Sequence, residues 1–296
     1  MNLAEFVRRF RVADPQHFRL ADRDPGDTSG LDINKKEGKD LLEEGIKRLA
    51  DLQERLYAQQ RHAVLAIFQA MDAAGKDSAI KHVMSGVNPQ GCDVHSFKAP
   101  TEEELRHDFL WRTTLRLPDR GRIGIFNRSY YEEVLVVRVH PEMLARQRLP
   151  GNPAGEEALW QERFEDIRAF ERHLARSGTI ILKFHLQLSR KEQKKRFLER
   201  IDTPSKNWKF SMGDIAERKL WDAYMAAYED MIRNTSTPEA PWYVVPADAK
   251  WFTRLIVAGA LVEALERLGP AYPTLDDAAR GQLAKAREEL LKEDEA

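Results

Sequence analysis

The stretch between Val64 and Ser78 constrains the fold of this chain more than any other. Five apolar residues, Val64 to Phe68, precede a turn of small residues that contains Gly75 and Lys76, and a helical pattern follows. A strand that delivers such a turn to a helix N-terminus aims backbone N–H groups and the helix dipole at one point, where the lysine adds a full positive charge. The stretch therefore predicts a strand, a phosphate-binding loop and a helix. The residues expected to bind phosphate here are Ala73, Ala74, Gly75, Lys76, Asp77 and Ser78.

The loop departs from the usual pattern of two glycines followed by a lysine and a hydroxyl residue. Ala70 stands at the first glycine position, Asp77 takes the hydroxyl position, and Ser78 lies one residue late. An acidic residue inside the loop, Asp72, indicates a site that holds a metal or activates an acceptor, beyond cradling a phosphate. The alternative is an ordinary turn with an accidental Gly-Lys pair, but the strand before it and the helix after it favour phosphate binding.

Composition places few other limits on function. The 296 residues suit one large α/β domain, and Lys and Arg (47) nearly balance Asp and Glu (48), so the net charge of −1 points to neither nucleic acid nor a membrane. A single cysteine, Cys92, excludes an intrachain disulfide, and residues 1–18 lack the apolar core of a signal peptide. We expect a cytoplasmic protein that binds neither nucleic acid nor membrane.

Strands and helices alternate along the rest of the chain. Strands are expected at 63–68, 92–97, 122–127, 179–186 and 242–245, and helices at 35–60, 76–85, 101–116, 129–139, 155–176 and 248–267. This alternation predicts a parallel sheet covered by helices on both faces, with ligands at the carboxyl ends of the strands. Three parts are expected along the chain: an extended surface arm at 1–34, the main domain at 35–270, and a charged helix or tail at 271–296.

A second polar cluster follows the strand expected at 122–127. Many phosphoryl-transfer enzymes carry an acidic residue here to hold Mg²⁺, whereas this chain has Asn127, which offers a neutral carbonyl. Arg128 comes next and can either clamp a phosphate with two N–H groups or form a structural salt bridge. Spacing does not choose between Glu132 and Glu133 as a further site residue, and either can lie on a solvated helix face.

The segment from about 189 to 233 breaks the alternation and is interpreted as a helical excursion of two helices. Between residues 190 and 209 it carries eight basic and three acidic residues, a net charge of +5. A solvated helix face is the usual explanation of such a run. The alternative is a cationic lid beside the phosphate loop, whose target would be a polyanion or a nucleotide.

Three segments together resemble the family-2 polyphosphate kinases, P-loop enzymes that move phosphoryl groups between inorganic polyphosphate and nucleotides. They are residues 71–78, 126–132 and 205–211, the last with 221–224 beyond it. The resemblance spans residues 35 to 265 or so and implies a three-layer α/β/α fold with a two-helix lid, dependence on Mg²⁺ or Mn²⁺, and a homodimer or homotetramer. It also implies a polyphosphate chain held beneath the lid and adenine or guanine nucleotides as partners.

Carried over by position, the resemblance implies a role for each polar residue. Asp72 would be the metal-linked catalytic aspartate, Lys76 the catalytic loop lysine on the transferred group, and Arg128 the catalytic phosphate clamp. Asn127 would join Asp72 as a metal ligand; many members carry Asp there, and the Asn form resembles the subgroup that accepts both AMP and ADP. Nucleotide contacts are expected from Asn127, Glu133 and Lys209. Further contacts to phosphate or polyphosphate are expected from Lys81, Arg196, Arg200, Lys206 and Lys209.

These features predict a polyphosphate-dependent nucleotide kinase that transfers a phosphoryl group to ADP or AMP by direct, in-line, Mg²⁺-assisted attack, without a covalent enzyme intermediate. An ATP-dependent nucleoside monophosphate kinase is the first alternative, because related loops there also carry an Asp and a basic lid. A noncatalytic polyanion or nucleic-acid binder is the second, and it leaves Asp72 and the Asn127-Arg128 pair without a role.

Overall fold

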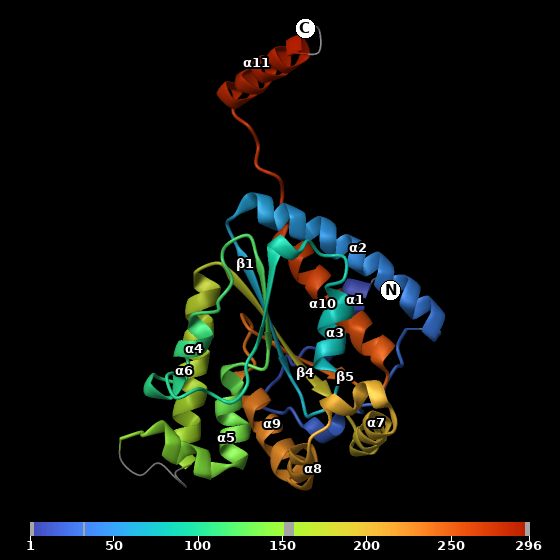
Figure 1. Ribbon diagram of the computed structural model, residues 1–296, viewed down its shortest axis with the longest axis vertical. Helices are drawn as coiled ribbons and strands as arrows, with labels where there is room; N and C mark the ends of the chain where they lie inside the picture. Colours follow the sequence, from blue (N-terminus) through green and yellow to red (C-terminus); the bar gives the residue numbers. More distant parts are fainter. Residues whose placement is uncertain (1–2, 32, 151–156, 294–296) are drawn as a thin grey trace.

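The computed structural model describes residues 3–31, 33–150 and 157–293, and a five-stranded sheet lies at its centre (Figure 1). The strands run in the order β2-β3-β1-β4-β5, and every neighbouring pair is parallel. Their bounds are β1 Ala63–Gln69, β2 Cys92–Ser96, β3 Ile123–Asn127, β4 Thr179–Gln187 and β5 Trp242–Pro246. The predicted parallel α/β sheet is confirmed, and its strands share one carboxyl edge because they all run the same way.

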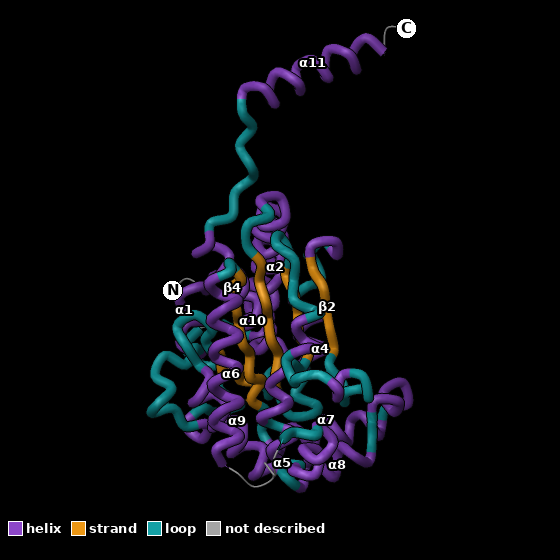
Figure 2. The backbone as a smooth tube through the Cα atoms, turned by 90° about the vertical axis from the view of Figure 1, so that its left-hand side faces the viewer, coloured by secondary structure: helices purple, strands orange, loops and turns teal. Residues whose placement is uncertain are grey.

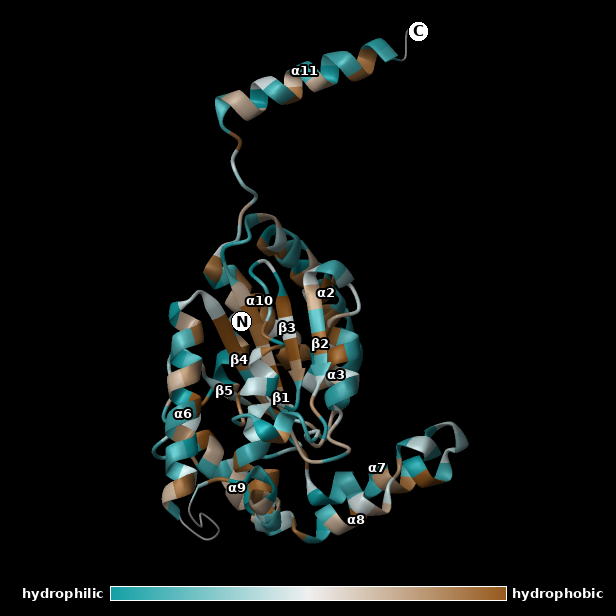
Figure 3. Ribbon diagram, turned by 60° about the vertical axis from the view of Figure 1, so that its left-hand side comes forward, coloured by the Kyte–Doolittle hydropathy of each residue, from teal (hydrophilic) through white to brown (hydrophobic). Residues whose placement is uncertain are grey.

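Helices cover both faces of the sheet, which gives the expected three layers (Figure 3). One face carries α2 (Lys35–Gln59), α3 (Lys76–Val83) and α10 (Lys250–Leu268), and the other carries α6 (Glu157–Arg176) and α9 (Trp221–Thr235). Alternate residues of β1 serve the two layers, because Val64, Ala66 and Phe68 join the first core while Leu65 and Ile67 join the second. Each fully buried Leu, Ile or Phe side chain stabilises the fold by roughly 1.5–3 kcal/mol.

The last helix, α11 (Asp277–Glu293), stands apart from the sheet at the end of an extended linker (Figure 2). None of its described residues is buried. No helix in the described part of the chain combines the length and the apolar character needed to cross a bilayer.

The N-terminal segment packs into the core, so the expectation of an extended surface arm is wrong. It forms the short helix α1 (Leu3–Val7), and Phe6 and Phe10 pack edge-to-face against Phe252 of α10. The chain then runs beside β5, where the amide of Val12 donates to a strand carbonyl at 2.8 Å. The sequence pattern does not predict this packing, because the apolar residues of the segment are spaced irregularly among Asp, Arg and Pro residues.

One expected helix, at 101–116, is replaced by two short turns. They are a 3₁₀ turn, Glu104–Arg106, and a single helical turn, α4 (Trp111–Thr114). A capping box is present at Thr101, since the hydroxyl of Thr101 accepts a hydrogen bond from the amide of Glu104 and the amide of Thr101 donates to the Glu104 carboxylate. The helix does not continue, because the side chain of Asp108 accepts a hydrogen bond from the amide two residues later and starts a new turn.

Two further helices differ in extent from the expectation. The helix expected at 129–139 is a 3₁₀ turn followed by the one-turn helix α5 (Val136–Val139). The second helix of the excursion is divided at Leu220 into α8 (Met212–Lys219) and α9. The first two residues of the helix expected at 155–176 lie outside the described residues. Helical spacing marks an apolar face, but it does not mark where side-chain hydrogen bonds interrupt the backbone ladder.

A buried ion pair ties the second helical layer to the sheet. Lys183 of β4 is fully buried, and its Nζ donates to Glu171 of α6 at 2.6 Å, to the hydroxyl of Tyr131 at 2.8 Å and to the carbonyl of Thr235 at 2.7 Å. Glu171 also accepts hydrogen bonds from the hydroxyls of Tyr130 and Tyr131. Burial lowers the pKa of Lys183 although Glu171 opposes the shift. The network joins β4, α6, α9 and the turn after β3.

Removing one member of this pair is expected to cost more than removing both. Lys183→Met leaves the Glu171 carboxylate buried without its charge partner, so the free energy of unfolding should fall by about 3–5 kcal/mol. The double variant Lys183→Met with Glu171→Leu should recover most of that loss, because no unpaired charge remains. Denaturant unfolding at a fixed protein concentration measures both variants. A double variant that is no more stable than the single one would contradict this account of the contact.

Candidate functional site

The carboxyl ends of the strands open into a cleft of about 670 Å³. The loop between β1 and α3 lies at its base, and the other walls come from the ends of β2 and β3, the start of α10, and the segment after β4. The predicted site residues that line the cleft are Asp72, Ala73, Ala74, Gly75, Lys76, Asp77, Ser78, Asn127, Arg128, Arg196, Arg200, Lys206 and Lys209. Most of the residues that line this cleft were therefore predicted from the sequence. Lys81 and Glu133, which were also predicted, do not line it.

The loop between β1 and α3 has a strained backbone. Ala73 adopts a left-handed conformation with φ of 64°, and Gly75, directly before α3, has φ of 104°. A non-glycine residue in this region costs about 1–3 kcal/mol and persists only when its surroundings hold it there. Lys76 folds back beneath the turn, where its Nζ donates to Ala70 O at 2.8 Å. Burial, followed by the charge of Arg128, lowers the pKa of Lys76, while Asp72 and Glu132 oppose the shift.

A second left-handed residue, Arg128, follows β3 with φ of 65°. Its Nη2 donates to Asp72 Oδ1 at 3.0 Å, which joins the predicted phosphate clamp to the predicted catalytic aspartate. Its Nη1 lies 3.9 Å from Glu132 Oε2. Burial raises the pKa of Glu132, while Arg128 and Lys76 oppose that shift. Of the two glutamates that the sequence left open, Glu132 is therefore the one that interacts with the cleft.

Glu133 does not line the cleft, and its predicted contact with a nucleotide stays a prediction. Its carboxylate accepts hydrogen bonds from Gln147 at 2.6 Å and from Arg163 at 3.2 Å, and it lines a separate cavity of about 260 Å³. Glu132 and Glu133 share one 3₁₀ turn, in which a step of one residue rotates the side chain by about 120°. Only one of the two can therefore face Arg128.

Lys81 is exposed on α3 and does not line the cleft, so its predicted contact with phosphate stays a prediction. It follows Lys76 by five residues, so it is rotated by about 140° around the helix axis. Ser78 stays within the cleft, and its hydroxyl accepts a hydrogen bond from Arg254 of α10 at 2.8 Å.

Three polar side chains of the cleft have the chemistry to hold Mg²⁺. Asn127 Nδ2 donates to Asp77 Oδ1 at 2.7 Å, and Asp72 lines the same cleft. Within the described residues, no three His, Cys, Asp or Glu side chains gather as a metal cage. Mg²⁺ does not need one, because it keeps several waters and takes one or two carboxylates together with substrate phosphate oxygens. Asp77, which the sequence did not propose as a ligand, fits this mode together with Asp72 and the carbonyl of Asn127.

The α7–α8 segment, Arg190–Lys219, forms the outer wall of the cleft and extends from the body (Figure 3). It consists of α7 (Arg190–Asp202), a 3₁₀ turn (Pro204–Lys209) and α8. Arg200 pairs with Asp214 at 3.4 Å, and Lys206 pairs with Glu199 at 2.6 Å. Both cations line the cleft, and among the described residues their ion-pair partners belong to the same segment.

Trp208 and Lys209 complete this wall. The Trp208 side chain is largely exposed, and Lys209 Nζ lies 5.0 Å from the centre of its ring. Around the whole cleft, eight cationic side chains face four carboxylates. This excess of positive charge favours a ligand with several negative charges.

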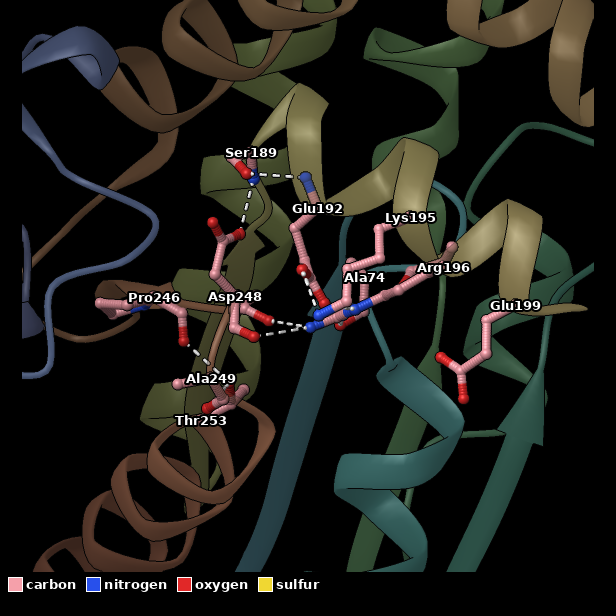
Figure 4. Close-up of polar contacts among 12 residues, drawn as sticks. Ala74, Ser189, Glu192, Lys195, Arg196, Glu199, Pro246, Asp248, Ala249 and Thr253 are labelled. Atoms are coloured by element: carbon pink, nitrogen blue, oxygen red, sulfur yellow. Dashed lines mark hydrogen bonds and ion pairs between the residues drawn. The ribbon is translucent and has the colours of Figure 1, made fainter. Parts of the chain in front are cut away.

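Arg196 of α7 also lines the cleft, but its guanidinium is 4% exposed and fully used within the protein. Its five hydrogen bonds go to Glu192 and to the backbone carbonyls of Ala73, Ala74, Ala247 and Asp248; Figure 4 shows part of this arrangement. Arginine has five N–H donors in all. Each N–H group of Arg196 therefore has an acceptor within the protein, and its predicted contact with phosphate stays a prediction.

The family model described as polyphosphate kinase 2 matches residues 32–271 of the chain. This chain belongs to the polyphosphate kinase 2 family. A Rhodopseudomonas palustris protein named ADP-polyphosphate phosphotransferase is 52% identical over 286 residues, which cover 97% of this chain and 99% of that one. A Meiothermus ruber protein named AMP/ADP-polyphosphate phosphotransferase is 47% identical over 273 residues, which cover 92% and 98%.

The fold of this family member is also similar to a solved one. The crystal structure of polyphosphate kinase 2 from Arthrobacter aurescens TC1 matches with a TM-score of 0.87 and 42% sequence identity, and the match covers 97% of each chain. The family resemblance and the P-loop kinase fold predicted from the sequence are both confirmed.

Some residues that line the cleft of this polyphosphate kinase 2 family member were not predicted from the sequence. Phe97 and Lys98 follow β2, and Lys250 begins α10 shortly after β5. The signal that could have found them is their place just after a strand, because parallel strands share one carboxyl edge. Glu199 and Asp214 carry no such signal, since they come from the α7–α8 segment.

A histidine connects α8 to the body of the domain. His140 follows α5; its Nε2 lies 2.9 Å from Glu217 of α8 and its Nδ1 lies 3.2 Å from Glu142. The hydroxyl of Tyr224 donates to the same Glu217 carboxylate at 2.5 Å. Burial alone would lower the pKa of His140, but Glu217 and then Glu142 more than offset it, so the pKa lies above its ordinary value. Because α8 also carries Asp214, this contact helps to place one wall of the cleft.

The contact between His140 and α8 is expected to weaken as the pH rises. The pKa of His140 in the folded protein lies above 6.5, so its stabilisation is complete below that value and is lost as the pH rises through the folded pKa. Amide hydrogen exchange of residues 212–219, corrected for the intrinsic effect of pH, should be faster at about pH 8.5 than at about pH 6. His140→Gln, which stays neutral, should abolish the difference. A difference that survives in this variant would assign the effect to another group.

Proposed function

We propose that this protein transfers a phosphoryl group from inorganic polyphosphate to ADP and AMP. The observation that carries the proposal is one cleft in which a phosphate loop faces the cations of the α7–α8 segment, with eight cationic side chains against four carboxylates. Cations that extend beyond the loop suit a donor that is itself a chain of phosphates. The relatives named ADP-polyphosphate and AMP/ADP-polyphosphate phosphotransferase support this donor and these acceptors.

The proposed reaction asks for little covalent chemistry from the protein. A terminal phosphate oxygen of the nucleotide attacks the end phosphorus of polyphosphate in line; a new P–O bond forms while the bridging P–O bond breaks, and the shortened chain leaves. Nucleophile and leaving group are both phosphate oxygens, so no general base is needed. Lys76 and Arg128 stabilise charge on the transferred group, and Asp72, held by Arg128, faces the acceptor. Mg²⁺ bound through Asp72, Asp77 and Asn127 would neutralise further phosphate charge.

The α7–α8 segment is proposed to act as a lid over the bound polyphosphate. Arg200, Lys206 and Lys209 line the cleft wall, where they would contact successive phosphates. Closure over the substrates would exclude water, which otherwise competes with the nucleotide as acceptor. A noncatalytic polyanion binder would need the same cations, but it gives no reason for the Asp72–Arg128 pair beside the phosphate loop.

The phosphoryl donor separates this proposal from an ATP-dependent nucleoside monophosphate kinase. With polyphosphate as the only donor, the protein should convert ADP to ATP and AMP to ADP; with ATP as the only donor, it should not phosphorylate AMP at a comparable rate. Lys76→Met should lower kcat with polyphosphate by about 100-fold or more, because charge on the transferred group loses its stabilising partner. Separation and quantification of the nucleotides measure both effects.

Lys285→Ala serves as the matched control for the lysine substitution. Lys285 lies on the exposed helix α11, so this variant loses the same charge outside the cleft and should keep wild-type turnover. ADP formation from AMP and ATP at the polyphosphate-dependent rate would favour the monophosphate kinase instead. Near-normal turnover by Lys76→Met would show that the catalytic assignment of the loop is incorrect.

Asn127→Asp is expected to tighten metal binding. The substitution places a second carboxylate beside Asp77, at a position where the two side chains are now 2.7 Å apart. Repulsion between the carboxylates is relieved by a divalent cation, so the Mg²⁺ concentration for half-maximal activity should fall several-fold. The control Asn88→Asp adds the same charge in the turn before β2 and should leave the Mg²⁺ requirement unchanged. An unchanged requirement in Asn127→Asp would place the metal elsewhere.

A further inference from the structure

Arg196 joins three parts of the chain that are distant in sequence. From the middle of α7, its Nη1 donates to Ala73 O at 3.0 Å and to Ala74 O at 2.9 Å, both in the phosphate loop. Its Nη2 donates to Ala247 O at 2.6 Å and to Asp248 O at 3.0 Å, between β5 and α10. Its Nε donates to Glu192 at 3.0 Å, one turn earlier on α7. We call these five hydrogen bonds the Arg196 clasp (Figure 4).

The clasp holds the strained part of the phosphate loop. Ala73 has φ of 64°, a conformation that its own side chain disfavours. Within the turn, the amide of Ala74 donates to Met71 O at 3.2 Å. From outside the turn, Arg196 donates to the carbonyls of Ala73 and Ala74. These contacts supply the surroundings that a strained residue requires.

The clasp also fixes where the loop amides point. In a trans peptide, the carbonyl and the following N–H point in opposite directions. Because Ala74 O is directed at the guanidinium, the N–H of Gly75 is directed away from it, at the point where α3 begins. The first N–H groups of a helix have no partner within the helix and are the groups that bind an anion. Arg196 therefore acts on the anion site through the backbone, from the opposite side of the loop.

Residues near Arg196 also attach the first half of α7 to the phosphate loop and to the turn after β5, through further hydrogen bonds. Gln193 Nε2 donates to Asp72 O at 3.0 Å. The amide of Ser189, which caps α7, donates to the Asp248 carboxylate at 2.8 Å (Figure 4). The amide of Asp248 donates to Pro25 O at 3.1 Å. The beginning of α7 is thus bound to the loop and to the strand ends, unlike the exposed cations that follow it in the α7–α8 segment.

We propose that Arg196 is a positioning residue that sets the backbone of the phosphate loop from α7, and that it does not bind polyphosphate or nucleotide. Its kinetic consequence rests on the proposed function, whereas its effect on the loop does not. Lysine separates the two roles. A lysine keeps a positive charge that can bind phosphate, but its single ammonium group cannot bond four carbonyls and a carboxylate in the fork geometry of a guanidinium.

The test compares Arg196→Lys with the wild-type protein in two measurements. Amide hydrogen exchange without ligand should be about tenfold or more faster at residues 73–77 in the variant, because the loop opens more often. In the polyphosphate-to-ADP assay, kcat should fall by about 10- to 100-fold while KM for polyphosphate changes little, because misplaced loop amides act on the transferred group. Lys194→Ala is the matched control, since Lys194 is an exposed lysine of the same helix; both measurements should stay at wild-type values.

The outcomes are distinguishable. Arg196→Lys with wild-type kcat and wild-type loop exchange would overturn the proposal, and so would a raised KM for polyphosphate with unchanged kcat and unchanged exchange. If the wild-type protein shows no transfer from polyphosphate, the proposed function fails, but the exchange measurement still decides whether the clasp holds the loop.

A second variant covers the case in which Arg196→Lys does not fold, as judged by circular dichroism. Glu192→Gln leaves the four carbonyl bonds of Arg196 in place and removes only the charged acceptor at Nε. It should raise exchange at residues 73–77 by about two- to fivefold, a weaker effect of the same kind. Unchanged exchange in Glu192→Gln would then count against the clasp.

Discussion

The ion pair between Asp72 and Arg128 is the contact on which the geometry of the cleft depends. It joins the ends of two neighbouring strands, β1 and β3, and each partner lies at or beside a left-handed residue that is not glycine. The sheet contributes directly, because the amide of Arg128 donates to Phe68 O at 3.0 Å and so continues the pairing of β3 with β1. Strain of this kind persists only where several contacts fix the backbone. Contacts within the protein therefore set the geometry of this part of the cleft.

The cations of the cleft fall into two physical classes. Lys76 and Arg196 are buried and bonded to loop carbonyls, so they shape the site as much as they charge it. Lys206 is paired with Glu199, and both side chains are nearly half exposed. Such exposed pairs contribute only about 0–1 kcal/mol, so a polyanion can displace the glutamate at little cost. The exposed cations of the outer wall are therefore free to bind a ligand. The buried cations at the base of the cleft are instead bonded to the protein backbone.

The sequence predicted those parts of the site that depend on local pattern. Val64 to Ser78 specified a strand, a loop and a helix, and parallel strand ends then brought Asn127 and Arg128 to the same edge. The sequence did not predict the role of a residue where that role depends on a tertiary contact. Arg196 looked like its neighbours in a basic run, because backbone carbonyls carry no side-chain signature that would have revealed its partners. Lys183 in the middle of an apolar strand was a usable signal of a buried partner, but Glu171 was one of many glutamates on a helix.

The central claim is that donor and acceptor meet in one cleft and that the phosphoryl group passes directly between them. Initial rates of ATP formation, with polyphosphate and ADP each varied at several fixed concentrations of the other, test this claim most directly. The single cleft predicts double-reciprocal plots that intersect, because both substrates must be bound together before transfer. Parallel lines, together with isolation of a phosphorylated protein after incubation with polyphosphate alone, would show a covalent intermediate and contradict it.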